Sequence, residues 1–378
     1  MPPVLMALYL GLISGTSMDG IDAALAEVDT RGCSVKHAQS RPYADALRTQ
    51  LFEIVNDPDH CNLDQLGRLD TEVGEAFATV ALDVLRDAGV AATQLTAIGS
   101  HGQTIRHQPH GEHPFTWQVG NPHLIAERTG ITTVADFRRR DVAAGGEGAP
   151  LMPAFHQAVL ASPGENRAVI NVGGIANLTW LPRAAPVIGF DTGPGNCLMD
   201  GWASRHLGAA FDREGQWAAN GRTHAELLAR LLAEPFLAAE APKSTGRELF
   251  NLPWLERQLK ALGNTVKPED VQATLCELTA RSIADACRRL GGPQRVLLCG
   301  GGSHNHELRR RLETQFPGVP VDTTAVFGLD PDHVEATGFA WLAFRTLGGL
   351  SGNLPAVTGA QHSVILGAIH PGRTVTRP

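Results

Sequence analysis

Four short apolar runs in this chain of 378 residues each end in glycine with a polar residue close by. The runs are "LTAIGSHG", "RAVINVGGIANLT", "PVIGFDTGPGN" and "QRVLLCGGGSHN". Apolar runs of this length are typical of buried strands, and stretches with helical periodicity separate them. The longest such stretch, "EDVQATLCELTARSIADACRRLGG", predicts a helix closed by Gly291. The alternation predicts an α/β protein in which several strands end at one cleft.

The length of the chain exceeds what one hydrophobic core usually organises, so we expect two lobes with a cleft between them. A strand, a glycine turn and an aspartate occur together once in each half, which predicts a duplicated architecture. We expect an N-terminal lobe of residues 1–133 plus 350–378 and a C-terminal lobe of residues 134–349.

Charge and cysteine usage exclude several classes of partner. The formal net charge of -7 gives no general attraction to phosphate backbones or anionic lipid, so we expect no nucleic-acid and no membrane partner. No two of the six cysteines stand in a CxxC spacing, which is typical of thiols in a reducing compartment. Because the chain also lacks a basic start and an apolar run of about 18 residues, we expect a cytoplasmic protein.

The stretch "YLGLISGTSMDGIDAALAEV" places a Gly-Thr-Ser turn between two expected strands. Such a turn offers closely spaced N–H groups and hydroxyls, which suit phosphate oxygens. The same letters also describe a plain β-hairpin. The chain has neither a GxxxxGK[ST] loop nor a GxGxxG fingerprint after a strand, so a P-loop kinase and a Rossmann dehydrogenase are disfavoured.

Two later turns carry similar features. In "FDTGPGN" the carboxylate of Asp191 is expected at a strand end before a helix N-terminus, either as a general base beside a phosphate or as a helix cap. In "CGGGSHN" three glycines form either a flat surface for a purine or a tight strand-to-helix turn.

In the order GTSMDG, GFDTGPGN and CGGGSHN, the three turns resemble the ATPase core of sugar kinases, actin and Hsp70 chaperones. The resemblance implies a two-lobed, actin-like fold, duplicated from a ribonuclease H-like unit, that clamps ATP in a central cleft. One position departs from it: Ile13 stands where that superfamily normally has an aspartate. An acid in the first loop must therefore come from Asp19 or Asp22.

Further strings narrow the resemblance: "GLISGTSMDGIDAAL", "SHGQTIRHQP", "TWQVGNPHLIAERTGITTVADFRRRDVAAGGEGAPLMPAFH" and "NVGGIANLT". These are similar to the anhydro-N-acetylmuramic acid kinase family, through nearly the whole chain. The family implies conversion of 1,6-anhydro-N-acetylmuramic acid, ATP and water to N-acetylmuramic acid 6-phosphate, in peptidoglycan recycling. The alternative is a conventional sugar kinase of the same core, in which Asp191 takes a proton from a substrate hydroxyl.

The resemblance also assigns residues. Asp191 matches the catalytic aspartate, and Mg²⁺ is expected with ATP, although the sequence does not name its ligands. The expected ATP-binding residues come from three turns, the last two by analogy with the superfamily: Gly15, Thr16, Ser17, Met18, Asp19, Gly20, Ile21, Asp22, Gly173, Gly174, Gly300, Gly301 and Gly302.

For the amino sugar, "ADFRRRD" offers Arg138 and Arg140, and a guanidinium fork suits the lactyl carboxylate. Arg138 is the preferred member, although a run of arginines is also typical of a solvated face. His101 stands at an expected strand end, as a sugar ligand or a satisfied core histidine, and Glu335 stands near a helix start, which favours carboxylates in any case. The family resemblance further implies a homodimer.

Overall fold

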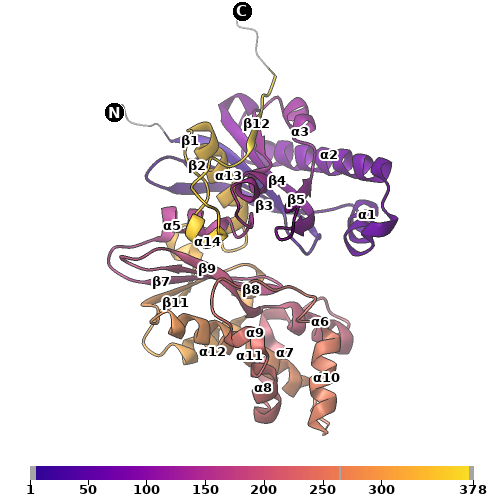
Figure 1. The fold of residues 1–378 in the computed structure, drawn as a ribbon, viewed down its shortest axis with the longest axis vertical. Coiled ribbons are helices and arrows are strands. Elements are labelled where there is room, and N and C mark those ends of the chain that lie inside the picture. Colours follow the sequence, from indigo (N-terminus) through magenta and orange to yellow (C-terminus); the bar gives the residue numbers. More distant parts are fainter. Residues whose placement is uncertain (1–5, 264, 374–378) are drawn as a thin grey trace, which may run out of the picture. The chain divides into compact units, whose positions relative to one another are not determined.

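The computed structural model describes residues 6–263 and 265–373, whose contacts divide the chain into two compact units (Figure 1). The first unit contains the described residues of Met1–Val159 and His333–Pro378, and the second is Leu160–Asp332. A discontinuous first unit and a continuous second unit were expected, but residues 134–159 and 333–349 lie with the first. The reason is that strand β6 and helix α13, defined below, pack into the first sheet.

The first unit is built on a mixed sheet. Three antiparallel strands come first, and two later strands run parallel to the first of them, in the order β3-β2-β1-β4-β6. Strand β12 pairs antiparallel with β6, and β5 pairs with β4. The strands are β1 (Ala7–Ser14), β2 (Gly20–Val28), β3 (Cys33–Pro42), β4 (Leu95–Gln108), β5 (Phe115–Val119), β6 (Thr133–Ala135) and β12 (Ala368–His370).

The second unit repeats this strand order. Its sheet runs β9-β8-β7-β10-β11, again with three antiparallel strands followed by two parallel ones. The repeated order confirms the predicted fold class, a duplicated, ribonuclease H-like α/β fold. The strands are β7 (Arg167–Val172), β8 (Ile175–Leu181), β9 (Ile188–Pro194), β10 (Arg295–Cys299) and β11 (Val321–Thr323).

Helices flank both sheets. In the first unit and at its boundary these are α1 (Asp45–Asn56), α2 (Leu63–Asp87), α3 (Pro122–Thr129), α4 (Phe137–Ala143), α5 (Met152–Leu160), α13 (Val334–Leu347) and α14 (Pro355–Thr358). In the second unit they are α6 (Cys197–Leu207), α7 (Gln216–Asn220), α8 (Ala225–Leu232), α9 (Pro235–Ala238), α10 (Leu252–Leu262), α11 (Pro268–Arg289) and α12 (His306–Gln315). Short 3₁₀ turns lie at Pro58–His60, Ala92–Gln94, Arg213–Gly215, Gly301–His304 and Thr324–Phe327. Across the described part of the chain, no helix is long and apolar enough to span a bilayer.

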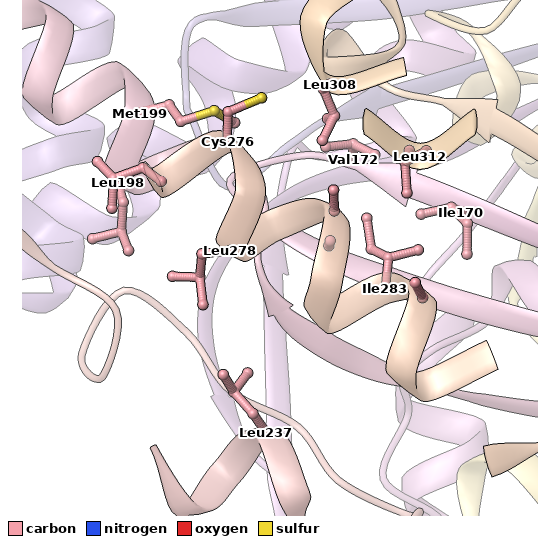
Figure 2. Close-up of a cluster of buried hydrophobic side chains, with 14 of the residues drawn as sticks. Ile170, Val172, Leu198, Met199, Leu237, Cys276, Leu278, Ile283, Leu308 and Leu312 are labelled. Carbon is pink, nitrogen blue, oxygen red and sulfur yellow. The ribbon is translucent and has the colours of Figure 1, made fainter. Parts of the chain in front are cut away.

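Helix α11 is the centre of the second unit's core. It is the long helix that the sequence predicted, and its last residue, Arg289, lies two positions before Gly291. In Figure 2 its side chains Cys276, Leu278 and Ile283 lie among apolar residues from α6, α9, α12 and β7. Each fully buried leucine or isoleucine stabilises the fold by about 1.5–3 kcal/mol, so this helix fixes the position of the sheet and of its loops.

Helix α13 lies against the first sheet with almost no space between backbones. A Cβ atom added at Gly11 would overlap the carbonyl of Ala336, and one added at Gly99 would overlap the carbonyl of Phe339. Glycines on β1 and β4 therefore let the helix approach the sheet this closely. The same contact holds Glu335, in the first turn of α13, near the carboxyl end of β1.

We expect Gly99→Ala to lower the free energy of unfolding by about 2–3 kcal/mol, because the new methyl group forces the helix away from the sheet. Gly32→Ala is the matched control, since a Cβ there meets nothing within 4 Å. Urea titration followed by circular dichroism measures both. Equal stability of the two variants would contradict the packing described for α13.

Candidate functional site

The turn after β1 leaves backbone donors without acceptors. Among the residues that the structure describes, the N–H groups of Thr16 and Ser17 donate to no acceptor, while that of Met18 donates to the Gly15 carbonyl, with N and O 3.2 Å apart. Space around Gly15 is open, with only the Ser17 hydroxyl 4.0 Å from an added Cβ. Met18 holds a left-handed φ of 52°, a strain that is common at functional turns. These features favour an anion-binding turn over a plain β-hairpin.

Gly20, Asp19 and Asp22 of this turn all contact residues of the first unit. A Cβ at Gly20 would overlap the carbonyl of Arg41 on the neighbouring strand, so Gly20 is needed for strand pairing. Asp19 is exposed and its carboxylate accepts a hydrogen bond of 2.8 Å from Ser17. Asp22, on β2, accepts a short hydrogen bond from the Ser40 hydroxyl. Both carboxylates of the first loop are therefore bonded to serines of the same unit.

The buried His101 and the half-buried Arg138 form one pair. The Nε group of Arg138 donates to Nε2 of His101 over 2.8 Å, and Nδ1 of His101 lies 2.9 Å from the carbonyl of Gly102. Because Nε2 accepts, the proton is on Nδ1 and the ring is neutral. Burial, followed by the charge of Arg138, holds the pKa of His101 well below its usual range. Both ring nitrogens are thus used within the protein, and the role of His101 as a direct sugar ligand stays a prediction.

The guanidinium of Arg138 keeps one end available. Its Nη1 group donates to the carbonyl of Gly148 over 2.8 Å, and Nη2 takes part in neither this bond nor the bond to His101. The carboxylate of Glu335, an exposed residue, is near enough to interact electrostatically with both Arg138 and Asp22. The structure therefore brings three predicted residues of the first unit together: His101, Arg138 and Glu335.

The three consecutive arginines of α4 point to different surroundings. Arg139 donates to the Thr116 carbonyl over 3.3 Å, and its guanidinium lies 5.9 Å from the centre of the Trp117 ring. Arg140 is exposed, as a solvated face would require. Only Arg138 joins the histidine and the glutamate, which supports its choice as the preferred member.

Asp191 lies within β9 rather than at its end. The β9 strand continues to Pro194, and the next helix, α6, has Asn196 at its N-terminal boundary. The Oδ2 atom of Asp191 accepts hydrogen bonds from the Ser244 hydroxyl over 3.1 Å and from the Thr245 N–H over 3.0 Å. The carboxylate therefore does not cap α6. Burial raises its pKa, and the bonds from Thr245 and Ser244 only partly offset that effect.

The segment around residues 243–248 is the part of the site that sequence reasoning missed. Lys243 donates from Nζ to the Phe236 carbonyl over 2.9 Å, and burial lowers its pKa to about 8. The guanidinium of Arg247 lies beside the second glycine turn, 3.4 Å from where a Cβ of Gly174 would stand. The letters "KSTGRE" combine hydroxyls, a glycine and two cations, but they lack the periodicity that locates a strand or helix.

The remaining glycines separate into structural and open positions. An added Cβ at Gly300 would overlap the Asn171 side chain, and one at Gly302 would overlap Val172, so these two glycines serve a tight turn. Gly301 is exposed and has no atom nearer than 4.0 Å to an added Cβ. At Gly173 the space is similarly open, with the nearest atom at 3.5 Å. The flat surface expected from three glycines is therefore limited to Gly301.

Among residues 6–263 and 265–373, no group of three or more His, Cys, Asp or Glu side chains is placed to hold a metal ion. Mg²⁺ in nucleotide sites commonly keeps several waters and takes only one or two carboxylates from the protein. Asp19 and Asp22 suit an ion that is bound in this way.

Comparison with known proteins identifies the family. A model of the family described as "Anhydro-N-acetylmuramic acid kinase" matches residues 7–372. The chain is 56% identical over 368 residues to the protein of that name from Xylella fastidiosa (strain Temecula1 / ATCC 700964), with 96% of each chain covered. It is 54% identical over 369 residues to that of Xanthomonas campestris pv. campestris (strain 8004), covering 96% of this chain and 97% of the relative. It is 51% identical over 367 residues to that of Coxiella burnetii (strain Dugway 5J108-111), with the same coverage. The chain therefore belongs to the anhydro-N-acetylmuramic acid kinase family.

Proposed function

We propose that this protein converts 1,6-anhydro-N-acetylmuramic acid, ATP and water to N-acetylmuramic acid 6-phosphate and ADP, a step of peptidoglycan recycling. The observation that carries the proposal is the setting of Asp191. One oxygen of its carboxylate is held by Ser244 and Thr245, and burial raises its pKa, which makes the carboxylate a stronger proton acceptor. The match of nearly the whole chain to the kinase family supports the choice of substrate.

The substrate has no free 6-hydroxyl, because O6 is bonded to C1. Water must therefore attack C1 to release O6, and a base is needed to take a proton from that water. A water oxygen forms a bond to C1 while the bond between C1 and O6 breaks, and O6 takes the γ-phosphoryl group from ATP. Asp191 takes one proton of that water, and ADP is the leaving group at phosphorus. The product thus carries a hydroxyl at C1 and a phosphate on O6. Positioning and charge stabilisation supply most of the acceleration in phosphoryl transfer.

For ATP, we propose the open turns as phosphate and nucleoside contacts. The N–H groups of Thr16 and Ser17, which meet no acceptor among residues 6–263 and 265–373, would donate to phosphate oxygens, and Gly173 and Gly301 leave room for the nucleotide to approach the backbone. Gly20, Gly300 and Gly302 support these turns through packing. When bound, Mg²⁺ would neutralise charge on the phosphates, with Asp19 or Asp22 as its carboxylate contact, directly or through water.

For the sugar, we propose that Arg138 pairs with the lactyl carboxylate and that His101 positions Arg138. Arg138→Gln should raise the KM for the sugar by about 10- to 100-fold, because a charge-assisted hydrogen bond contributes about 1.5–3 kcal/mol. Arg128→Gln is the control, since Arg128 forms an exposed ion pair with Glu75, and should leave KM within about twofold. Steady-state kinetics with both variants provide the test, and an unchanged KM for Arg138→Gln would remove that residue from the sugar site.

The alternative is a conventional kinase that phosphorylates a free sugar hydroxyl. ADP release measured with each sugar separates the two, because N-acetylmuramic acid has a free 6-hydroxyl and the anhydro sugar does not. We expect ADP release with the anhydro sugar and at least about 100-fold less with N-acetylmuramic acid, which lacks the bond whose cleavage the site is proposed to drive. Preference for N-acetylmuramic acid would overturn the proposal.

We further propose that the protein is a cytoplasmic homodimer. All six cysteines are free, which fits a reducing compartment. The dimer follows from the family resemblance alone. Light scattering coupled to size-exclusion chromatography tests it, with a monomeric mass as the contrary result.

A further inference from the structure

The first unit contains a cavity of about 500 Å³ that neither Arg138 nor Glu335 lines. It lies where α2 and α3 meet β4, β5, β6 and β12, and all of its lining residues belong to this one unit. Its volume is within the range of small-molecule sites, about 300–1,000 Å³. Of the predicted site residues, only His101 lines it, and both nitrogens of that ring are already bonded within the protein.

Two buried polar atoms in the lining have no partner. Ser100 is 1% exposed, and its hydroxyl makes no hydrogen bond with any residue in 6–263 and 265–373. The Nε2 atom of His370 is likewise buried and unpaired within those residues. Burying a hydroxyl without a hydrogen bond costs about 1–3 kcal/mol, so the fold retains these groups at a penalty that a bound ligand would relieve.

The rest of the lining has the chemistry of a site for a hydroxylated ring. Trp117 is 39% exposed and offers a flat apolar face that can pack against C–H groups. Asp70 already accepts one hydrogen bond, from the Gly120 N–H over 2.8 Å, and its second carboxylate oxygen remains for a ligand hydroxyl. Asp136 adds a second carboxylate, from the left-handed backbone conformation, φ 59°, that begins α4.

The charges of the lining favour a neutral ligand over an anion. Asp70 and Asp136 carry two negative charges, and the one arginine, Arg139, is held beside Asp136 with an N–O distance of 3.5 Å and against Trp117. Burial, followed by the nearby His123, lowers the pKa of His370, so that ring adds no positive charge at neutral pH. A phosphate group would therefore meet a net negative wall.

We propose that this cavity binds a neutral hydroxylated ring of sugar size, with Ser100 and His370 bonded to its hydroxyls and Trp117 packed on its face. All of the lining residues belong to the first unit, whereas Asp191 belongs to the second, and we expect occupancy of the cavity not to depend on the kinase reaction. The expected ligand class is a neutral monosaccharide, with or without an acetamido group.

The test uses N-acetylglucosamine as the probe and the full-length protein, with binding measured by saturation-transfer difference NMR. We expect binding to the unaltered protein and to Asp191→Asn, at least about fivefold weaker binding to Ser100→Ala, and about tenfold weaker binding to Trp117→Ala. Phe115→Ala is the matched control, because Phe115 is an exposed aromatic residue of the same strand that does not line the cavity. Turnover of the anhydro sugar by Trp117→Ala should stay within about twofold, which separates this site from the kinase site.

Three results would overturn the assignment. One is no binding of the probe by the unaltered protein, in which case the unpaired atoms bond to water. Another is equal binding to the unaltered protein, Ser100→Ala and Trp117→Ala. The third is complete displacement of the probe by the anhydro sugar together with loss of binding in Asp191→Asn, which would locate it at the kinase site.

Discussion

Asp191→Asn is expected to lower kcat for the anhydro sugar by at least about 10³-fold while the affinity for ATP stays within about twofold, because removal of a positioned general base costs about 10²- to 10⁴-fold. The amide has nearly the shape of the carboxylate and its oxygen can still accept from Ser244 and Thr245, so the fold should remain. It cannot take a proton from water. The loss should therefore be in chemistry and not in nucleotide binding.

The pH dependence gives a second readout of the same residue. Asp191 must be deprotonated to act, and burial raises its pKa, so kcat/KM should begin to fall on acidification at a pH above the ordinary range of an aspartate. For the substitution Asp191→Asn, the matched control is Asp285→Asn, since Asp285 forms an exposed ion pair with Arg288. Calorimetric titration measures ATP affinity, and kinetics measure turnover. If Asp191→Asn keeps near-normal turnover with the fold intact, the assignment of the base fails.

Asp141→Ala is expected to lower the free energy of unfolding by about 3–5 kcal/mol, because it leaves several buried donors without an acceptor. The Asp141 carboxylate is fully buried. It accepts hydrogen bonds from the Gly148 N–H over 2.8 Å, from Nδ2 of Asn353 over 2.7 Å and from the Thr358 hydroxyl over 2.8 Å. One side chain thus joins α4 to two segments that are more than 200 positions away in the sequence.

The same substitution should also weaken catalysis. Gly148, held by Asp141, is the residue whose carbonyl accepts from Arg138, so a loosened loop leaves that guanidinium less well oriented. Urea titration of the stability and the KM for the sugar measure the two effects. Asp285→Ala is the exposed control and should change stability by less than about 0.5 kcal/mol. A loss for Asp141→Ala no larger than that of the control would contradict the role given to its three hydrogen bonds.

The sequence predicted the fold through features that are local in the chain. Residue periodicity predicted the strand ends marked by glycine and the long amphipathic helix up to Arg289. The repeated strand order follows from the duplication of that pattern. The boundaries between units were placed less well. Residues 134–159 and 333–349 join the first unit through pairing of β6 with β4 and packing of α13 on Gly99, which are contacts between distant segments.

In the candidate site too, features that are local in the sequence could be predicted, and contacts between distant segments could not. The Gly-Thr-Ser turn and Asp191 could be singled out because their residue types suit phosphate and proton transfer. Asp191 accepts hydrogen bonds from Ser244 and Thr245, which lie more than 50 residues further along the chain. No local sequence pattern predicts contacts between such distant positions. The pairing of His101 with Arg138 is equally non-local. Both nitrogens of His101 are bonded within the protein, which fits the satisfied histidine that the sequence left open beside the sugar ligand.

The most direct test of the proposed reaction is turnover of 1,6-anhydro-N-acetylmuramic acid with ATP in water enriched in ¹⁸O, with the product analysed by mass spectrometry. If Asp191 directs water to C1 while O6 accepts the phosphoryl group, the label will be at C1 and none will be in the phosphate ester. Label in the phosphate group, or phosphorylation of a free sugar hydroxyl without ring opening, would contradict the account.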